Sequence, residues 1–316
     1  MSVAQSRKLL CSFLPDVHSA IGRSNLALLS GCLSLDHRAH AGRPSFSHQQ
    51  MSTSLRRSVF AILIAGLLPS TASATWSIVI LDPKTQRIGV AGASCTGYVY
   101  GIMGLLPGKG VLIAQAISND PSIRQAMKLL DQGVSTDSIW RVISNPVFDA
   151  QLSIRQYGLA TLRGEIVQYT GAGTPDYHGD RKAPNVLVQG NTLPGPEVLD
   201  RVMAAIRDAQ TARRTLEDVL MAGLQAGADA GGDRRCGAQR AMSSFLVVAG
   251  PDEPVGRPYL SLIVFGSDSS GVNAVDFLHT KLMEWEANGG PKNRRSRMDF
   301  QPPASPPKEP DVIRIP

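Results

Sequence analysis

The region after residue 74 contains short apolar runs with the length and composition of β-strands. These runs are rich in β-branched or small apolar residues and are bounded by Gly, Pro or Asp. The first two flank Asp82-Pro83-Lys84-Thr85 and therefore predict a hairpin. The predicted strands are 76–81, 87–94, 111–117, 151–162, 165–170, 185–189, 242–248 and 259–265.

Apolar residues with helical spacing lie between groups of these strands. Asp120-Pro121 has the residue types of an N-cap and a first helical position, and Ile123, Met127 and Leu130 share one face of the helix that follows. A capping box at 215–218 predicts the start of another helix, which continues to about residue 228. The remaining helices are predicted at 136–144, after 194–196 and at 272–287.

The order of these elements is strands, helices, strands, helices, strands and a final helix. Because strands and helices do not alternate one by one, the pattern favours antiparallel sheets covered by pairs of helices. The sequence therefore predicts a layered α+β fold over 75–287. The segment 288–316 holds seven of the chain's 21 prolines and little apolar periodicity, so we expect a disordered, proline-rich tail there.

The segment 51–74 has the features of a secretory signal peptide. Arg56 and Arg57 precede the uncharged apolar run 59–68, and Ala72-Ser73-Ala74 forms an A-x-A cleavage site. The apolar run is shorter than the ~20 residues that span a bilayer, so a retained membrane anchor is the minor alternative.

These features predict export to the periplasm or the cell exterior, without a stable membrane anchor. A signal peptide begins near its charged region, so Met51 is the expected start of translation. Residues 1–50 carry no organised pattern and are expected to be a disordered upstream extension.

The charge of residues 75–316 gives no reason to expect a nucleic-acid partner. The whole chain has 32 Lys and Arg against 26 Asp and Glu, but residues 75–316 hold 25 against 24. A nearly neutral region lacks the basic surface that typifies nucleic-acid binding.

Two histidines remain after the predicted cleavage site. His178 and His279 do not belong to clusters with ligand spacing, so we expect no metal site and no cofactor. Cys95 and Cys236 are the two cysteines of this region, and such a pair is more often bridged than free in an oxidising compartment.

Cleavage after Ala74 makes Thr75 the first residue of the mature chain. A threonine with a free α-amine carries a hydroxyl nucleophile and a weak base on one residue. The alternative is that Thr75 simply begins a strand, where threonine is common.

Several familiar catalytic and nucleotide-binding motifs are absent. The segment 104–110 lacks the spacing and the Ser or Thr of a phosphate-binding loop. The segment 92–97 has its second glycine one place late for G-x-S-x-G and ends a strand instead of forming a strand-to-helix elbow. No H-E-x-x-H occurs, and the glycines at 171–173 do not open a helix.

Polar residues gather where the predicted strands end. Gln115 and Asn119 follow one strand, Asn191 follows another, and Asp233 and Arg234 lie in a glycine-rich loop. Amide, carboxylate and guanidinium groups can orient an amine and donate hydrogen bonds to an oxyanion. The alternatives are local roles, in which Asp233 caps a loop and Arg234 forms a surface ion pair.

Five segments, taken in order, resemble the family called domain of unknown function 1028. They are T-W-S-I-V from Thr75, G-V-A-G-A-S from Gly89, Q-A from Gln115, Q-G-N from Gln189 and G-G-D-R-R from Gly231. The resemblance covers about residues 75–277. That family is placed in the N-terminal-nucleophile (Ntn) hydrolase superfamily, which implies a four-layer αββα sandwich of two mostly antiparallel sheets. It also implies an amidohydrolase-like site around Thr75.

The chain departs from the family's usual loop, G-D-[KR]-R-G-x-Q-S-A. Cys236 is inserted before Gly237, so Gln239 comes one place late, and Arg240 replaces the serine. Cys95 stands where the family commonly has a bulky or basic residue. A Cys95–Cys236 disulfide in an exported protein would explain both departures.

The residues and the resemblance together predict an exported Ntn-type amide hydrolase with Thr75 as the nucleophile. The expected substrate is a small amide or peptide-like molecule, such as a peptidoglycan fragment, because some family members carry an added peptidoglycan-binding domain. The alternative is a non-catalytic exported binding protein that retains the fold. The expected helper residues are Ser94, Asn119, Asn191, Asp233 and Arg234.

Overall fold

The computed structural model describes residues 75–266, 271–290 and 312–314. Contacts divide the chain into two units, Met1–Gly66 and Leu67–Pro316, and every described residue belongs to the second. The predicted upstream extension and signal peptide lie outside the described residues. Most of the predicted tail does so too, although the structure places a short strand at 312–314.

The larger of two sheets has seven strands. It is antiparallel at every pairing except that of β10 with β11. β1 lies between β2 and β8, so both edges of β1 are hydrogen bonded. The strands, in spatial order, are β11 (Val312–Arg314), β10 (Leu260–Phe265), β9 (Ser243–Ala249), β2 (Arg87–Ser94), β1 (Thr75–Asp82), β8 (Val186–Asn191) and β7 (Gly179–Ala183).

The smaller sheet has four antiparallel strands and faces the larger one. Its strands β4 and β5 contact β1, and β5 also contacts β8. The order is β3 (Met103–Leu106), β4 (Gly110–Gln115), β5 (Gln156–Thr161) and β6 (Ile166–Thr170).

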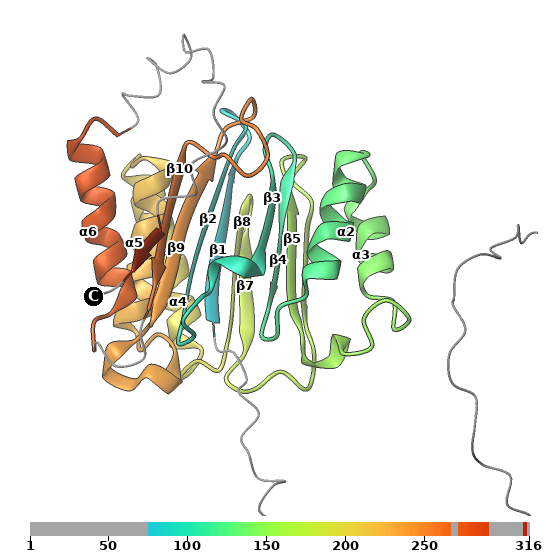
Figure 1. Cartoon of the computed structure of the whole chain (residues 1–316), viewed down its shortest axis with the longest axis horizontal. Helices are drawn as coiled ribbons and strands as arrows, with labels where there is room; N and C mark the ends of the chain where they lie inside the picture. The colour runs from blue at the N-terminus through green and yellow to red at the C-terminus, as the bar shows by residue number, and fades with distance from the viewer. Residues whose placement is uncertain (1–74, 267–270, 291–311, 315–316) are drawn as a thin grey trace, which may run out of the picture. The chain divides into compact units, whose positions relative to one another are not determined.

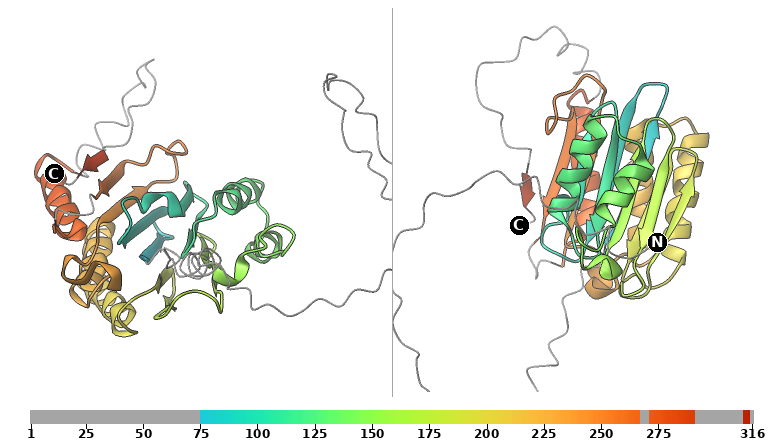
Figure 2. Two further views of the ribbon diagram at one scale, coloured as in Figure 1. Left: turned by 60° about the horizontal axis from the view of Figure 1, so that its bottom comes forward. Right: turned by 90° about the vertical axis from the view of Figure 1, so that its right-hand side faces the viewer.

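The helices lie in two groups on opposite sides of the strands (Figure 1). Three of them contact strands of the larger sheet and two contact strands of the smaller sheet, and Figure 2 shows the same separation from two other directions. The fold is therefore mixed α+β with two mostly antiparallel sheets, as the order of predicted elements indicates. The first group is α4 (Glu197–Thr211), α5 (Leu216–Asp229) and α6 (Ala274–Ala287), and the second is α2 (Asp120–Asp131) and α3 (Thr136–Ile143).

Strand β1 is buried on both faces, and its alternate residues divide between two cores. Ile78 packs in the apolar cluster under α4 and α5, whereas Val79 packs in the cluster between the two sheets. Because side chains of a strand alternate between its faces, Thr75 and Ser77 lie on the same face as Val79. The space between the sheets therefore changes from apolar to polar toward the start of β1.

The observed elements differ from the predicted ones in several places. The strand predicted at 151–162 is shorter, because β5 begins at Gln156 and Leu152–Ile154 form a 3-10 turn. The N-cap of α2 is Asn119, not Asp120, and its side chain accepts a hydrogen bond from the Ser122 N–H at 3.2 Å. The sequence pattern does not predict β3 and β7, since β3 is short and β7 is a polar edge strand without apolar alternation.

Candidate functional site

Thr75 is the first residue of β1 and is fully buried in the intact chain. The antiparallel registers place it opposite Ser94 on β2 and opposite Asn191 on β8. The Thr75 hydroxyl donates a hydrogen bond to Ser94 Oγ over 3.3 Å. Two of the predicted helper residues therefore flank Thr75 on adjacent strands.

Gln115, at the end of β4, joins the two sheets beside Thr75. Its Nε2 donates to the Thr75 carbonyl at 3.3 Å and to Gln156 Oε1 at 2.7 Å. Its Oε1 accepts from the Ser77 hydroxyl at 2.6 Å. Since a buried amide without partners is costly, these bonds fix the Gln115 side chain against the first residues of β1.

Gln156 extends this network along the facing strands. Its Nε2 donates to Thr170 Oγ1 at 2.9 Å and to the carbonyls of Gly179 and Gly190, each at 3.1 Å. Its Oε1 also accepts from Asn191 Nδ2 at 3.4 Å. Asn191 thus belongs to the glutamine network beside Thr75, and its side-chain nitrogen is held by Gln156.

Asp233 is fully buried in the glycine-rich loop and binds Cys95, the residue that follows Ser94 at the end of β2. Its Oδ2 accepts from the Cys95 N–H at 2.6 Å and pairs with Arg235 at 2.8 Å. Cys95 and Cys236 form a disulfide with their Cα atoms 5.5 Å apart, as the sequence predicts. The glycine-rich loop is therefore joined to the end of β2 by both a covalent bond and a charged hydrogen bond.

Arg234 occupies a different position from its neighbours in the loop. Its side chain is exposed, and its backbone N–H donates to the Thr192 carbonyl at 3.3 Å. Within the described residues its guanidinium has no hydrogen bond or ion pair. The structure therefore brings Asp233, but not the Arg234 side chain, to the end of β2.

A pocket of about 680 Å³ adjoins the Thr75 network. Two of the residues that line it contact the neighbourhood of Thr75. Gln115 donates to the Thr75 carbonyl, and Thr96 Oγ1 donates to Ser94 Oγ at 3.1 Å. Thr75 itself does not line the pocket in the intact chain.

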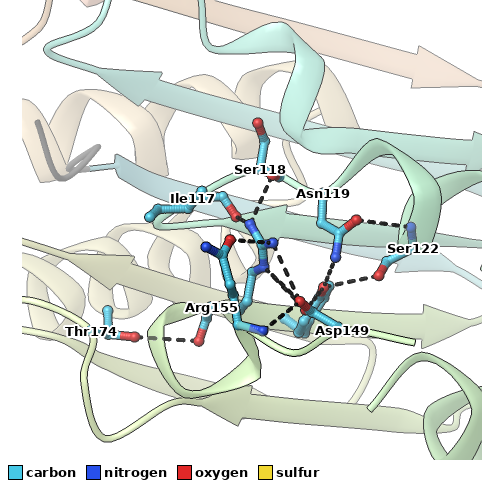
Figure 3. Close-up of polar contacts among 9 residues, drawn as sticks. Ile117, Ser118, Asn119, Ser122, Asp149, Arg155 and Thr174 are labelled. Carbon is cyan, nitrogen blue, oxygen red and sulfur yellow. Dashed lines mark hydrogen bonds and ion pairs between the residues drawn. The ribbon is translucent and has the colours of Figure 1, made fainter. Parts of the chain in front are cut away.

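The wall of this pocket at 116–118 is held in place by Arg155 (Figure 3). The guanidinium Nη1 donates to the carbonyls of Ile117 and Ser118 at 2.9 and 3.0 Å. Arg155 is in turn paired with Asp149, and their side chains are only 10% and 3% exposed. A buried ion pair from the β5 region therefore anchors a loop that lacks secondary structure of its own.

Asn119 ends the same loop, and both of its side-chain polar atoms are engaged. Its Oδ1 caps α2, and its Nδ2 donates to the Tyr157 hydroxyl at 3.0 Å. The Tyr157 hydroxyl donates to Asp149 Oδ2 at 2.9 Å, which connects the cap to the ion pair. The structure thus gives Asn119 a role in holding the start of α2.

The pKa values of this cluster keep Asp149 charged and Tyr157 neutral at neutral pH. Burial raises the pKa of the Asp149 carboxyl, but hydrogen bonds from Arg155 and Tyr157 outweigh burial and leave it below its usual value. Burial, together with the neighbouring Asp149 carboxylate, raises the pKa of Tyr157 to about 12. The ion pair and its hydrogen bonds therefore persist across the neutral range.

The sequence prediction misses several members of this arrangement. Gln156, Arg155 and Asp149 are all buried and carry most of the polar contacts between the two sheets and the loop. Arg155 and Gln156 are consecutive polar residues where the mostly apolar strand β5 begins. Such a polar pair next to apolar residues is a signal that could identify them as candidate site residues. Their partners lie far along the chain and could not be identified from the strand alone.

The described ranges contain no group of three or more His, Cys, Asp or Glu side chains that could hold a metal ion. Within these ranges, no helix combines the length and apolar character needed to cross a membrane. The chemical groups assembled around Thr75 are hydroxyls and amides, and the buried Asp233 carboxylate binds the backbone of Cys95, the residue after Ser94.

These features define a mixed α+β domain with a buried site of hydroxyl and amide groups between two sheets. The chain belongs to the family of unknown function DUF1028, whose model matches residues 75–270.

One similar solved structure is the crystal structure of protein SPO2555 from Silicibacter pomeroyi, which is described as matching the same family model. It is 23% identical, with a TM-score of 0.57, and the match covers 71% of this chain and 90% of that chain. At this identity the likeness concerns the fold alone. A search among curated proteins finds no match.

Proposed function

We propose that this protein is an exported N-terminal-nucleophile amide hydrolase in which Thr75 attacks the substrate. The observation that carries this proposal is the position of Thr75 at the start of β1, with its hydroxyl bound to Ser94 and its carbonyl bound to Gln115. The A-x-A triplet immediately before it provides a route to a free α-amine.

The arrangement of helices and sheets supports the proposal at the level of the fold. Helices contact strands of both sheets, and the two sheets face each other around the site. We propose that this is the four-layer αββα sandwich of Ntn hydrolases. Fold alone does not define an activity, so the chemical argument rests on Thr75 and its neighbours.

The proposed reaction begins when Thr75 Oγ1 forms a bond to the amide carbonyl carbon. The hydroxyl proton passes to the α-amine, whose ordinary pKa of about 7.7–8.0 suits a base near neutral pH. The carbon–nitrogen bond then breaks, the leaving amine takes that proton, and an ester remains on Thr75. A water molecule cleaves this ester, releases the carboxylic acid and returns the threonine hydroxyl.

The neighbouring residues have separate tasks in this proposal. Ser94 orients the Thr75 hydroxyl and, with main-chain N–H groups, donates hydrogen bonds to the oxyanion. Gln115 holds the Thr75 backbone by donating to its carbonyl. Gln115 and Asn191 also both donate to Gln156 Oε1, which fixes the amide groups around Thr75. Asp233 holds the end of β2 through Cys95, which keeps Ser94 in register with Thr75.

Export is the second part of the proposal. The disulfide between Cys95 and Cys236 supports an oxidising compartment, and the signal-like segment supports secretion to the periplasm or the cell exterior. Terminal sequencing of the exported protein should read Thr-Trp-Ser-Ile. A different first residue would leave Thr75 without a free amine and would contradict the mechanism.

A binding protein without catalysis is the second candidate. The burial of Thr75, and its absence from the residues lining the pocket in the intact chain, favour this candidate. In that case the pocket would hold an amide or peptide-like fragment without cleaving it.

A hydrolysis screen distinguishes the two candidates. The exported protein and its Thr75→Ala and Thr75→Ser variants are incubated with a panel of small amides, short peptides and cell-wall fragments. The proposal predicts cleavage by the native protein, loss of cleavage in Thr75→Ala, and residual cleavage in Thr75→Ser, because serine retains the hydroxyl and the amine. Equal cleavage by native protein and Thr75→Ala would refute the role of Thr75.

A further inference from the structure

The pocket beside Thr75 combines an exposed aromatic ring with a carboxylate from a different part of the fold. Tyr98 follows β2 of the larger sheet, and Asp120 begins α2, which contacts the smaller sheet. Tyr98 is 50% exposed, although aromatic side chains are usually much more buried. An exposed aromatic ring and a carboxylate in one pocket can both attract a cation.

The Tyr98 ring packs against a second aromatic ring. Tyr98 stacks on Phe265 of β10, with ring centroids 4.9 Å apart and planes inclined by only 4°. One face of Tyr98 is therefore covered by Phe265, and the half of the side chain that stays exposed lines the pocket. Burial, followed by the nearby Tyr100 and Asp120, raises the pKa of Tyr98, so its phenol remains neutral at neutral pH.

Asp120 is the charged side chain of this pocket. It is exposed, and among the described residues it has no ion-pair partner. The other residues lining the pocket have apolar, hydroxyl, amide or phenol side chains, or are glycine. The pocket therefore attracts a cation and repels an anion.

Apolar surface accompanies this charge. Ile117 is 39% exposed and lines the pocket, and Val99 and Ile102 are further lining residues. A ligand that suits these walls has an apolar group next to its positive charge. An aromatic face attracts a cation through its quadrupole, which adds to the attraction by the carboxylate.

We propose that this pocket binds a protonated amine through Tyr98 and Asp120, and that the protein's substrates are small amides carrying an ammonium group beside an apolar group. The proposal rests on the amide-hydrolase function above and adds a substrate class to it. Peptides with a free N-terminus and amino-acid amides belong to this class.

A simpler role for Asp120 is to stabilise the first turn of α2 through the helix dipole. That role requires only an acidic residue at the helix start. Asp137 has the same role in α3. It is also exposed and lies in the first turn of its helix, but it does not line the pocket. Asp137→Asn is therefore a matched control for Asp120→Asn.

The experiment measures binding without turnover, in the exported protein carrying Thr75→Ala. Leucinamide, with a protonated amine, and N-acetyl-leucinamide, its neutral counterpart, are titrated into this protein and followed by NMR. Thermal unfolding of each variant verifies that it is folded. We expect leucinamide to bind more tightly than its acetylated form by about fivefold or more, the size of an exposed charge or cation–π contact.

Variants of Tyr98 and Asp120 test whether these two residues cause the tighter binding of leucinamide. In the same Thr75→Ala protein, Asp120→Asn and Tyr98→Leu should each reduce the preference for leucinamide, and Asp137→Asn should leave it unchanged. Equal affinities for the two amides, no binding of either, or an equal effect of Asp137→Asn would overturn the proposal. Selective binding of leucinamide without its hydrolysis by native protein would support the pocket while refuting the proposed catalysis.

Discussion

The register of the β1–β2 hairpin places Thr75 directly opposite Ser94, with their hydroxyl oxygens 3.3 Å apart. Directly opposed residues of an antiparallel pair share one face of the sheet, so both hydroxyls point into the space between the two sheets. A slip of one residue would turn one of the two side chains to the opposite face. The turn after β1 therefore determines which residue accompanies the proposed nucleophile.

Gln115→Leu tests whether the amide network supports the start of β1. The substitution removes the acceptor of the Ser77 hydroxyl and leaves Gln156 Oε1 with only its longer hydrogen bond from Asn191, so we expect the free energy of unfolding to fall by about 2 kcal/mol. Denaturant unfolding measures this change. Gln210→Leu, at an exposed position of α4, is the control and should change stability little. Equal stabilities for the two variants would argue against the network.

Removal of the disulfide should lower stability substantially. The bond closes a loop of 141 residues, for which the chain-entropy model gives about 4–5 kcal/mol. We expect the double variant Cys95→Ser/Cys236→Ser to unfold at a lower denaturant concentration than the native protein. A reductant should destabilise the native protein but not the double variant. Insensitivity of the native protein to reductant would mean that the bridge is not formed in solution.

Asp149→Asn should destabilise the protein at neutral pH and leave Arg155 buried without its carboxylate. Removing one partner of a buried ion pair costs on the order of 3 kcal/mol. Denaturant unfolding at pH 7 measures the difference. Asp137→Asn, at an exposed position of α3, is the control and should have little effect.

The same pair predicts a pH dependence with a definite sign. The pKa of Asp149 is lowered in the folded protein, so its stabilising contribution is complete above the unfolded pKa, about 3.9, and is lost as the pH falls through the lower folded value. The stability difference between the native protein and Asp149→Asn should therefore narrow below about pH 4. A constant difference from pH 7 to pH 3 would contradict this account.

The sequence predicts local elements well where pattern and turn chemistry agree. The strand 87–94 has the predicted limits, and the predicted Thr215 cap of α5 accepts a hydrogen bond from the Asp218 N–H at 3.2 Å. The hairpin 75–94 follows from two apolar strands and a turn that Asp82 stabilises by accepting from the Lys84 N–H. These features depend on residues close together in the chain, which is why the sequence alone predicts them.

The candidate site is only partly predictable because its residues come from distant parts of the chain. Gln115 and Gln156 are 41 residues apart and meet because two sheets face each other, which no local pattern specifies. The Arg155 contacts with the 117–118 carbonyls depend on a loop whose path is set by the surrounding fold. Cys95 and Cys236 are the exception, because their positions in the two motifs indicate a bridge that the structure confirms.

The most direct test of the central claim changes only the amine of Thr75. Two forms of the protein are prepared, one beginning at Thr75 and one with a single alanine added before it, and the amide panel is offered to both. The account predicts hydrolysis by the form that begins at Thr75 and none by the extended form, because the extended form has a peptide bond in place of the base. Equal hydrolysis by the two forms would contradict an N-terminal nucleophile.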